Sequence, residues 1–463
     1  MTKGRKKVII MNREVNEVFT YIKLRNFMSF NEAVFDFRNG KKGPKKFVSI
    51  YGENGSGKSN FVQSIDFLIK SVVSFGVLGE TEKIREVMNQ KKFPDKLIHL
   101  IMEDVSVLSL AKRCRMAECE DETCIEYGFS VNGHDGYYIL HFAERFVYEK
   151  LYYFTGKQRG VLFEISVKDG KISHQFSSKL FDHKKVEMEL IDEITKFWGK
   201  HTFLSILAKE RKEKNEQYID ENYLPYVFDI LDMLREITVH CKKSPIGGIE
   251  ITAKKPVNVL ENLESGRVER SEEYILDSSE RIIREFFTQT YADIKDIFYE
   301  KKYEDKIITY KLFVKKMIGG KIRTIDFARE SAGTQRIVEI IRALLGAFCG
   351  VTVVYDEIDD GIHDLLLKII LDSMMDDITG QLIITTHNTY LLESSDIKSV
   401  YVIHVDYQGN KEIRCLDQYP RIQNSNNPRN MYLKGLFGGV PFVDMIDYDM
   451  IIQELGSDVE GGE

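Results

Sequence analysis

Residues 52–59 place glycines, a lysine and a serine at a spacing that suits a phosphate chain. The run Gly52-Glu53-Asn54-Gly55-Ser56-Gly57-Lys58-Ser59 fits G-x-x-x-x-G-K-[ST] at every fixed position. In such a loop the glycines let backbone N–H groups curl around phosphate oxygens, the lysine reaches the β- and γ-phosphates, and the hydroxyl holds Mg²⁺. The motif therefore predicts a nucleoside triphosphate site in which Lys58 and Ser59 have these two roles.

The flanks of this loop agree with that interpretation. An apolar strand is expected at 47–50, and residues 60–72 carry Phe61, Ile65 and Leu68 at helical spacing. A strand that enters the loop and a helix that leaves it give the phosphate a helix N-terminus with its positive dipole end. The alternative, a glycine turn with an incidental lysine, does not account for these flanks.

Two further apolar runs end in residues that can act on phosphate. Val351–Tyr355 ends at Asp356-Glu357, and 381–386 ends at His387. Asp356 can ligate Mg²⁺, and Glu357 can polarise a water for attack on the γ-phosphate. His387 can donate to a phosphate oxygen. Alone, each could be an ordinary turn or a core histidine, so their shared order with the phosphate loop is the discriminating fact.

The elements that must position these residues follow from periodicity. Alternating patterns predict strands within 21–37 and again from about 123 to 175, whereas 181–300 is mainly helical and heavily charged. After 305, strands and helices alternate, which is typical of an α/β fold.

With these motifs in place, the chain resembles the ABC-type ATPase heads of SMC, RecF and OLD-like proteins, in particular the "AAA-type" ATPases of bacterial defence operons. The resemblance extends to four more segments: Ile22–Phe30 (first strand), Glu330-Ser331-Ala332-Gly333-Thr334-Gln335-Arg336 (signature), Asp359–His363 (D-loop) and Tyr432–Pro441 (tail). It also takes in Asn60, directly after the phosphate loop. Two signature positions depart from the wider class, Ala332 for glycine and Thr334 for glutamine. The glutamine of the Q-loop cannot be placed within 76–122.

The resemblance implies an ABC-type P-loop ATPase head with a β subdomain, a mainly helical insertion and no long coiled-coil arm. The expected domains are 1–180 and 301–463, which together form the ATPase core, and 181–300, the insertion. ATP and Mg²⁺ are the implied cofactors. Ser331, Gly333 and Thr334 are expected to complete the site of a second subunit, so that ATP is sandwiched between protomers and favours self-association.

The resemblance to the defence subgroup implies an ATPase that acts as a sensor or regulator in anti-phage defence and controls a partner effector, a nuclease or a toxin. One rival is a RecF-like repair ATPase that binds duplex DNA. The other is a scaffold that uses ATP only to hold an oligomer together.

Composition limits the class without naming it. The 463 residues carry a formal charge of −7 and six cysteines, which excludes a uniformly basic nucleic-acid coat and a secreted disulfide scaffold. No apolar run is long enough to span a membrane, so a cytoplasmic protein with free cysteines is expected.

Three further groups of residues are weaker candidates for a binding or catalytic site. Cys114, Cys119 and Cys124 could bind zinc only with a distant histidine, and free cysteines are favoured. Arg235 and His240 have the R-x₄-H spacing of certain ribonucleases, at a level expected by chance. A basic turn could contact DNA phosphate or be a solvated hairpin; its lysines are Lys41, Lys42, Lys45 and Lys46, beside the N-terminal basic cluster.

Overall fold

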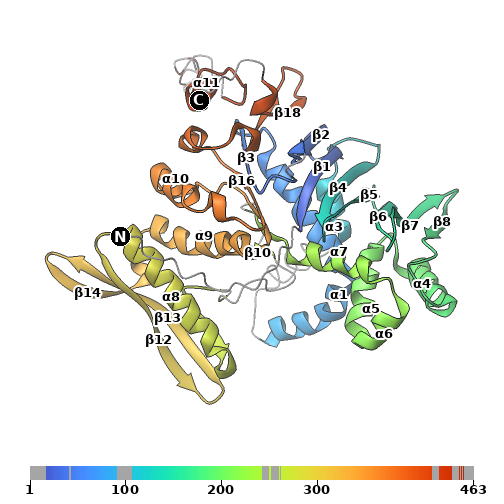
Figure 1. Cartoon of the computed structure of the whole chain (residues 1–463), viewed down its shortest axis with the longest axis horizontal. Helices are drawn as coiled ribbons and strands as arrows, with labels where there is room; N and C mark the ends of the chain where they lie inside the picture. Colours follow the sequence, from blue (N-terminus) through green and yellow to red (C-terminus); the bar gives the residue numbers. More distant parts are fainter. Residues whose placement is uncertain are drawn as a thin grey trace, which may run out of the picture.

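The structure is a computed structural model that describes residues 17–40, 43–90, 107–241, 250, 251, 260, 262–419 and 427–440, together with 448, 450 and 452. Within these residues the chain builds three sheets (Figure 1). The central sheet has the order β10-β9-β15-β16-β3-β17-β18, and the strands from β9 to β17 are parallel. Its strands are β3 (Phe47–Gly52), β9 (Thr238–His240), β10 (Glu250–Ile251), β15 (Thr352–Tyr355), β16 (Gln381–Thr385), β17 (Val400–Val405) and β18 (Lys411–Cys415).

Gln381, the first residue of β16, connects the central sheet to residues near the N-terminus by hydrogen bonds. Its side-chain amide donates to the backbone oxygens of Phe19, at 3.0 Å, and Lys45, at 2.9 Å, and its Oε1 accepts from the Phe19 N–H at 2.9 Å. The side chain is fully buried, so these bonds satisfy groups that water cannot reach.

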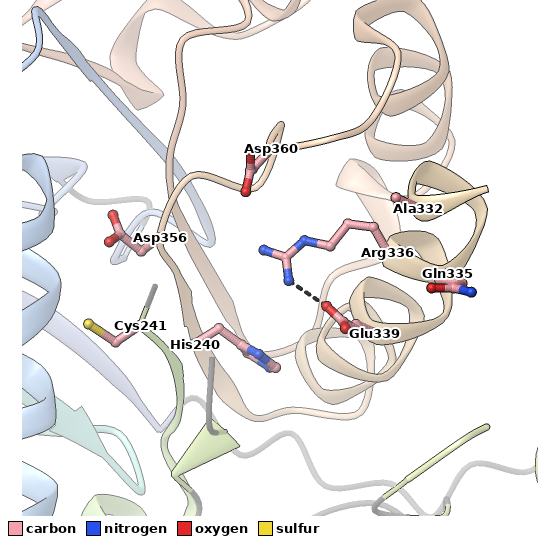
Figure 2. Close-up of a pocket in the computed structure, with 8 residues that line it drawn as sticks. All are labelled: His240, Cys241, Ala332, Gln335, Arg336, Glu339, Asp356 and Asp360. Atoms are coloured by element: carbon pink, nitrogen blue, oxygen red, sulfur yellow. Dashed lines mark hydrogen bonds and ion pairs between the residues drawn. The ribbon is translucent and has the colours of Figure 1, made fainter. Parts of the chain in front are cut away.

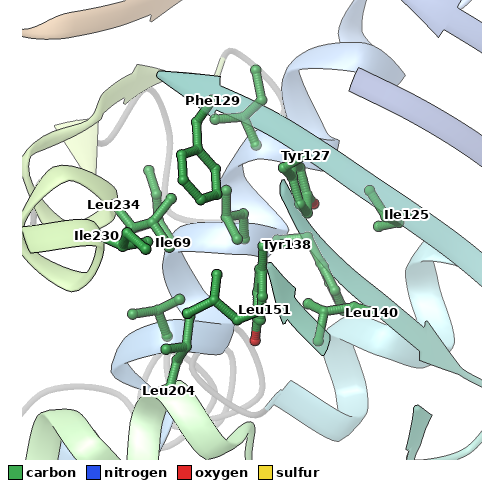
Figure 3. Close-up of a cluster of buried hydrophobic side chains, with 14 of the residues drawn as sticks. Ile69, Ile125, Tyr127, Phe129, Tyr138, Leu140, Leu151, Leu204, Ile230 and Leu234 are labelled. Atoms are coloured by element: carbon green, nitrogen blue, oxygen red, sulfur yellow. The ribbon is translucent and has the colours of Figure 1, made fainter. Parts of the chain in front are cut away.

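The second sheet is antiparallel, with the order β2-β1-β4-β5-β6-β7-β8. Its strands are β1 (Val18–Phe27), β2 (Phe30–Asp36), β4 (Thr123–Val131), β5 (His134–Phe142), β6 (Phe146–Phe154), β7 (Arg159–Lys168) and β8 (Lys171–Phe176). Ile125, Tyr127 and Phe129 alternate inward along β4 and pack with Ile69 of helix α1 (Lys58–Gln90) in one apolar cluster (Figure 3). The helix that starts at the phosphate loop is thus embedded in this subdomain.

A third sheet and its helix form the lower left of Figure 1. Strands β11 (Ser265–Glu269), β12 (Ile294–Glu304) and β14 (Lys321–Asp326) each pair with β13 (Ile307–Ile318). Helix α8 (Glu273–Thr290) packs on β12. The remaining α-helices of the described residues are α3 (Val107–Cys114), α4 (Lys184–Phe197), α5 (Phe203–Glu213), α6 (Glu216–Asn222), α7 (Pro225–Glu236), α9 (Ala332–Phe348), α10 (Asp364–Asp372) and α11 (Pro428–Leu433).

Glu149 on β6 joins the second sheet to the helical segment. Its carboxylate is fully buried and accepts four hydrogen bonds: from the Tyr138 hydroxyl (2.8 Å), the Trp198 indole (2.7 Å) and the backbone N–H groups of Phe203 (2.6 Å) and Leu204 (3.2 Å). Burial raises the pKa of Glu149, and the four donors act against that rise by stabilising the charged form.

The predicted mixed α/β fold is confirmed, and the longest helix among the described residues is α1, with no paired coiled-coil arm in that part of the chain. The boundaries at 180 and 300 stay a prediction. Two details differ from the sequence pattern: β9 lies inside the central sheet, and Ile294 onward is a strand, not a helix. β9 has three residues, too few to show a period, and β12 interrupts its alternation with charged residues.

Candidate functional site

The phosphate loop lies between β3 and α1, as its motif requires. Gly52 and Gly57 are both needed, because a Cβ at Gly52 would lie 2.5 Å from Ser56 Oγ and one at Gly57 would lie 2.8 Å from a carbon of the Phe30 ring. Lys58 folds over the loop and donates to the backbone oxygens of Gly52, at 2.8 Å, and Glu53, at 3.0 Å. Carbonyl acceptors are exchanged readily for phosphate oxygens, so this lysine is already in place for a ligand.

Lys58 is held beside the predicted acidic groups. Its side chain is 5% exposed, and burial lowers its pKa, while Glu357, Asp356 and Asp359 act in the opposite direction. The structure therefore brings the two halves of the predicted site together, although the motifs lie almost 300 residues apart.

Asp356 follows β15 and is 1% exposed. Its Oδ1 accepts from Thr385 Oγ1 at 2.7 Å, and a hydrogen bond with Ser59 also favours the charged form. Its Oδ2 is buried and has no hydrogen-bond partner in the described part of the chain. Burial raises the pKa of Asp356. A desolvated carboxylate oxygen beside the hydroxyl of Ser59 fits a Mg²⁺ ion, whose preferred ligands are such oxygens.

Glu357 has a backbone φ of +49°, uncommon for a residue with a side chain. Its N–H donates to Thr385 Oγ1 at 2.7 Å, the same hydroxyl that donates to Asp356. Thr385 thus orients both acidic residues, and the sequence motifs did not single it out. The signal was the parallel register: Tyr355 pairs with Ile384, so the residue after one lies beside the residue after the other.

His387 lies at the exposed end of the same edge. Its backbone N–H donates to Asp359, at 3.1 and 3.3 Å to the two carboxylate oxygens. Burial, then Lys58, lowers the pKa of His387, while Asp359, Glu357 and Asp356 raise it. The imidazole is thus near the lysine and the acidic groups.

The signature segment is placed differently. Ser331 caps α9, its Oγ accepting from the Thr334 N–H at 3.2 Å and pairing with the Thr334 hydroxyl at 2.7 Å. Ser331 and Ala332 are exposed. A Cβ on Gly333 would lie 2.7 Å from Gly361 O, so the signature packs on the D-loop. Among the described residues no hydrogen bond links Ser331, Gly333 or Thr334 to residues 52–60.

A pocket of about 380 Å³ is lined by the end of β9, the start of α9 and the loop after β15 (Figure 2). His240 stacks on Tyr355 with ring centroids 4.4 Å apart, and its backbone oxygen accepts from the Asp356 N–H at 2.9 Å. Burial lowers the pKa of His240 to about 3. His240 thus lines this pocket beside the acidic strand, and its stacking on Tyr355 gives it a structural role there.

The other two weak candidates lie partly within the described residues. Cys114 is buried, all six cysteines are free, and the described residues contain no group of three or more His, Cys, Asp or Glu able to hold a metal. Of the basic turn, Lys45 is 8% exposed and donates to the Tyr401 hydroxyl, so it faces the core, whereas Lys46 is exposed and its contact with DNA stays a prediction. Lys41, Lys42 and the N-terminal basic cluster lie outside the described residues, as does most of the Q-loop region (91–106).

The tail that resembles the defence subgroup packs beside the phosphate loop. Tyr432 stacks edge-on against Tyr51 at 5.6 Å, and a Cβ on Gly439 would lie 3.3 Å from Gly52 Cα. Tyr51, which belongs to β3, also donates its hydroxyl to Asn388 O at 3.0 Å, so it contacts both the tail and the loop that carries His387. No helix in the described residues is both long and apolar enough to cross a membrane.

Comparison with known proteins agrees with this geometry. Residues 227–393 match the family described as "AAA domain, putative AbiEii toxin, Type IV TA system", a range that holds the signature, Asp356, Glu357 and His387. No curated protein matches.

Similar solved structures include the SMC head domain from Thermotoga maritima (14% identity, 86% of this chain and 98% of that chain, TM-score 0.36). They also include an SMC head bound to the C-terminal winged-helix domain of ScpA (12%, 86% and 97%, 0.43) and an SMC head with an extended coiled coil bound to the C-terminal domain of ScpA derived from Pyrococcus furiosus (12%, 86% and 96%, 0.40). These TM-scores are low, so the fold is assigned here from the strand order and the geometry of the site. Residues 227–393 are therefore similar to an AAA-domain family named for a putative toxin of a type IV toxin–antitoxin system.

Proposed function

We propose that this protein binds and hydrolyses ATP with Mg²⁺ between two protomers, and that its nucleotide state controls a partner effector in anti-phage defence. The observation that carries the ATPase part is the Asp356 carboxylate, which is 1% exposed and keeps one oxygen without a hydrogen-bond partner beside Ser59 and Lys58. A buried carboxylate oxygen left open is costly unless a ligand completes it.

We assign a role in the reaction to each of the following groups of this chain. Backbone N–H groups of 53–59 hold the phosphates, and Lys58 moves from its carbonyl acceptors to the γ-phosphate. Glu357 accepts a proton from the attacking water as its oxygen bonds to the γ-phosphorus; the bond to the β–γ bridging oxygen then breaks, giving ADP and phosphate. His387 donates to a γ-phosphate oxygen. Ser59 and Asp356 would hold Mg²⁺, which when bound would supply positive charge against the developing negative charge.

The exposed signature supports the sandwich. Ser331 and Ala332 face solvent at the N-terminus of α9, a place where backbone donors can meet an anion. Because Gly333 packs against Gly361, a second protomer that contacts the signature would also affect the position of the D-loop, which follows Glu357. ATP then favours the dimer, since only the triphosphate is contacted by both protomers.

A path for a regulatory signal runs along α1. Thr202 at the start of α5 donates to Ser71 O at 3.0 Å, and Ser205 Oγ accepts from the Phe75 N–H at 3.1 Å. These buried bonds tie the helix that begins at Lys58 to the helical segment after residue 181. We propose that this segment or the adjoining subdomain conveys the nucleotide state to the effector, a nuclease or toxin.

Hydrolysis is tested by phosphate release from purified protein with ATP and Mg²⁺. Glu357→Gln should lower turnover about 100-fold or more, because a general base is lost, while ATP binding persists. Turnover near zero in the wild-type protein would favour the scaffold alternative.

The sandwich is tested by light scattering of Glu357→Gln at micromolar concentration. ATP should double its mass, and adding Ala332→Arg, which crowds the exposed signature without touching a buried contact, should return it to the mass seen without ATP. An ATP-independent monomer would refute the sandwich. A pull-down with the ATP-locked variant tests the effector, and duplex DNA that leaves turnover unchanged counts against the repair ATPase.

A further inference from the structure

A second lysine reaches the phosphate loop from the far end of the chain. Lys411 is the first residue of β18, and its Nζ donates to Ser29 Oγ and, at 3.3 Å, to the backbone oxygen of Gly55. A Cβ added to Gly57 would lie 3.1 Å from this Nζ. The β17–β18 hairpin therefore presents an ammonium group directly against the outer side of the loop.

The surroundings of this ammonium group are neutral. Besides Ser29 and Gly55 it lies 5.3 Å from the centre of the Phe30 ring, and no ion pair to Lys411 occurs in the described part of the chain. The side chain is half-buried, and burial lowers its pKa with no acidic group acting against it. Lys58, by contrast, has four carboxylates nearby, those of Glu357, Asp356, Asp359 and Glu53. A half-buried cation whose partners are only neutral dipoles is stabilised strongly when a ligand brings an anion to it.

The position of Lys411 indicates which part of the ligand it meets. Lys58, the acidic strand and His387 mark the γ-phosphate end. Lys411 instead shares Ser29 with Asn60, whose Nδ2 donates to Ser29 Oγ at 2.5 Å. Asn60 follows Ser59 on the first turn of α1, where the loop's N–H groups hold the phosphates nearer the nucleoside.

We propose that Lys411 binds the α-phosphate of the nucleotide and so sets affinity for ATP and ADP alike, without a part in hydrolysis. The proposal rests on the nucleotide site proposed above. It gives the hairpin a function in binding and makes the site depend on residues from both ends of the chain.

The test is calorimetric titration of Lys411→Met with ADP and with the non-hydrolysable analogue AMP-PNP, each with Mg²⁺. Both Kd values should rise by about tenfold and by the same factor, since both ligands carry the α-phosphate. Lys58→Met should weaken the analogue more than ADP, and Lys411→Arg should recover most of the affinity. Arg414→Met is the matched control, because Arg414 lies on the same strand, is exposed and pairs with Glu412 at 2.6 Å; its Kd values should equal those of the wild type.

Thermal melting separates binding from a structural role. Without nucleotide, Lys411→Met should melt at or above the wild-type temperature, because it removes a half-buried charge that no carboxylate offsets. Unchanged Kd values in Lys411→Met, with or without a lower melting temperature, would overturn the inference. Should the wild-type protein bind neither ligand, the proposed function itself fails, which is a different outcome.

Discussion

Two buried carboxylates, Glu149 and Asp356, lie in different parts of the molecule and differ in what their oxygens contact. Glu149 accepts four hydrogen bonds and lies far from the nucleotide loop in sequence and sheet. Asp356 has one oxygen bonded to Thr385 and another with no hydrogen-bond partner among the described residues. Burial alone therefore does not identify a functional acid. The carboxylate of Glu149, with its four hydrogen bonds, joins parts of the fold, whereas the carboxylate of Asp356, with one oxygen unbonded beside the phosphate loop, is the one that we propose as a Mg²⁺ ligand.

The largest expected effect is on stability at Glu149. Glu149→Ala leaves four buried donors without an acceptor, at roughly 1–3 kcal/mol each with partial relaxation, so the free energy of unfolding should fall by about 4 kcal/mol. Urea unfolding measures this. Glu164→Ala is the control: Glu164 pairs with Lys150 at 2.9 Å near the surface and should cost under about 1 kcal/mol. Equal losses of unfolding free energy in the two variants would contradict a structural role for the four hydrogen bonds of Glu149.

The next effect is on activity at Asp356. Asp356→Asn should lower Mg²⁺-dependent hydrolysis about 100-fold, while the free energy of unfolding without nucleotide stays unchanged or rises. Parallel phosphate-release and urea measurements test this pair of results. A loss of stability like that of Glu149→Ala would show that Asp356 is structural after all.

The same variant carries a pH signature. Since burial raises the pKa of Asp356, the folded state holds a proton that the unfolded state has lost above about pH 3.9. This residue's contribution to stability therefore falls as pH rises from there through the raised pKa. The stability of Asp356→Asn relative to the wild type, both without nucleotide, should increase over that window.

The smallest effect concerns the hydroxyl between the two acidic residues. Thr385→Val keeps the shape of the strand but removes the donor to Asp356 and the acceptor for the Glu357 N–H, so hydrolysis should fall about tenfold. Steady-state kinetics should place the loss in kcat more than in KM. Thr379→Val is the comparison. Thr379 is exposed and its hydroxyl donates to Phe348 O at 2.6 Å, with no hydrogen bond to either acid among the described residues, so kcat should stay within about twofold.

The sequence predicted the groups whose spacing along the chain is diagnostic: the phosphate loop, the acidic strand and His387. It could not predict Thr385 or Lys411, because their roles come from strand register and from a hairpin more than 350 residues after the loop. Glu149 was also out of reach, since in the alternating run of β6 it has the appearance of a surface acid. The short strand β9 was missed because three residues show no periodicity.

The bonds of Gln381 also have a consequence for how the protein is made. During synthesis, Phe19, Lys45 and strand β3 leave the ribosome more than 300 residues before Gln381 and strand β16, with which they bond. The central sheet cannot close until that late strand appears, so its contact order is high and its folding slow. β3, whose two neighbours β16 and β17 both come late, is then left with unpaired edges, which are prone to pair wrongly. Chaperone supply, more than the final stability, should govern how much active protein a cell obtains.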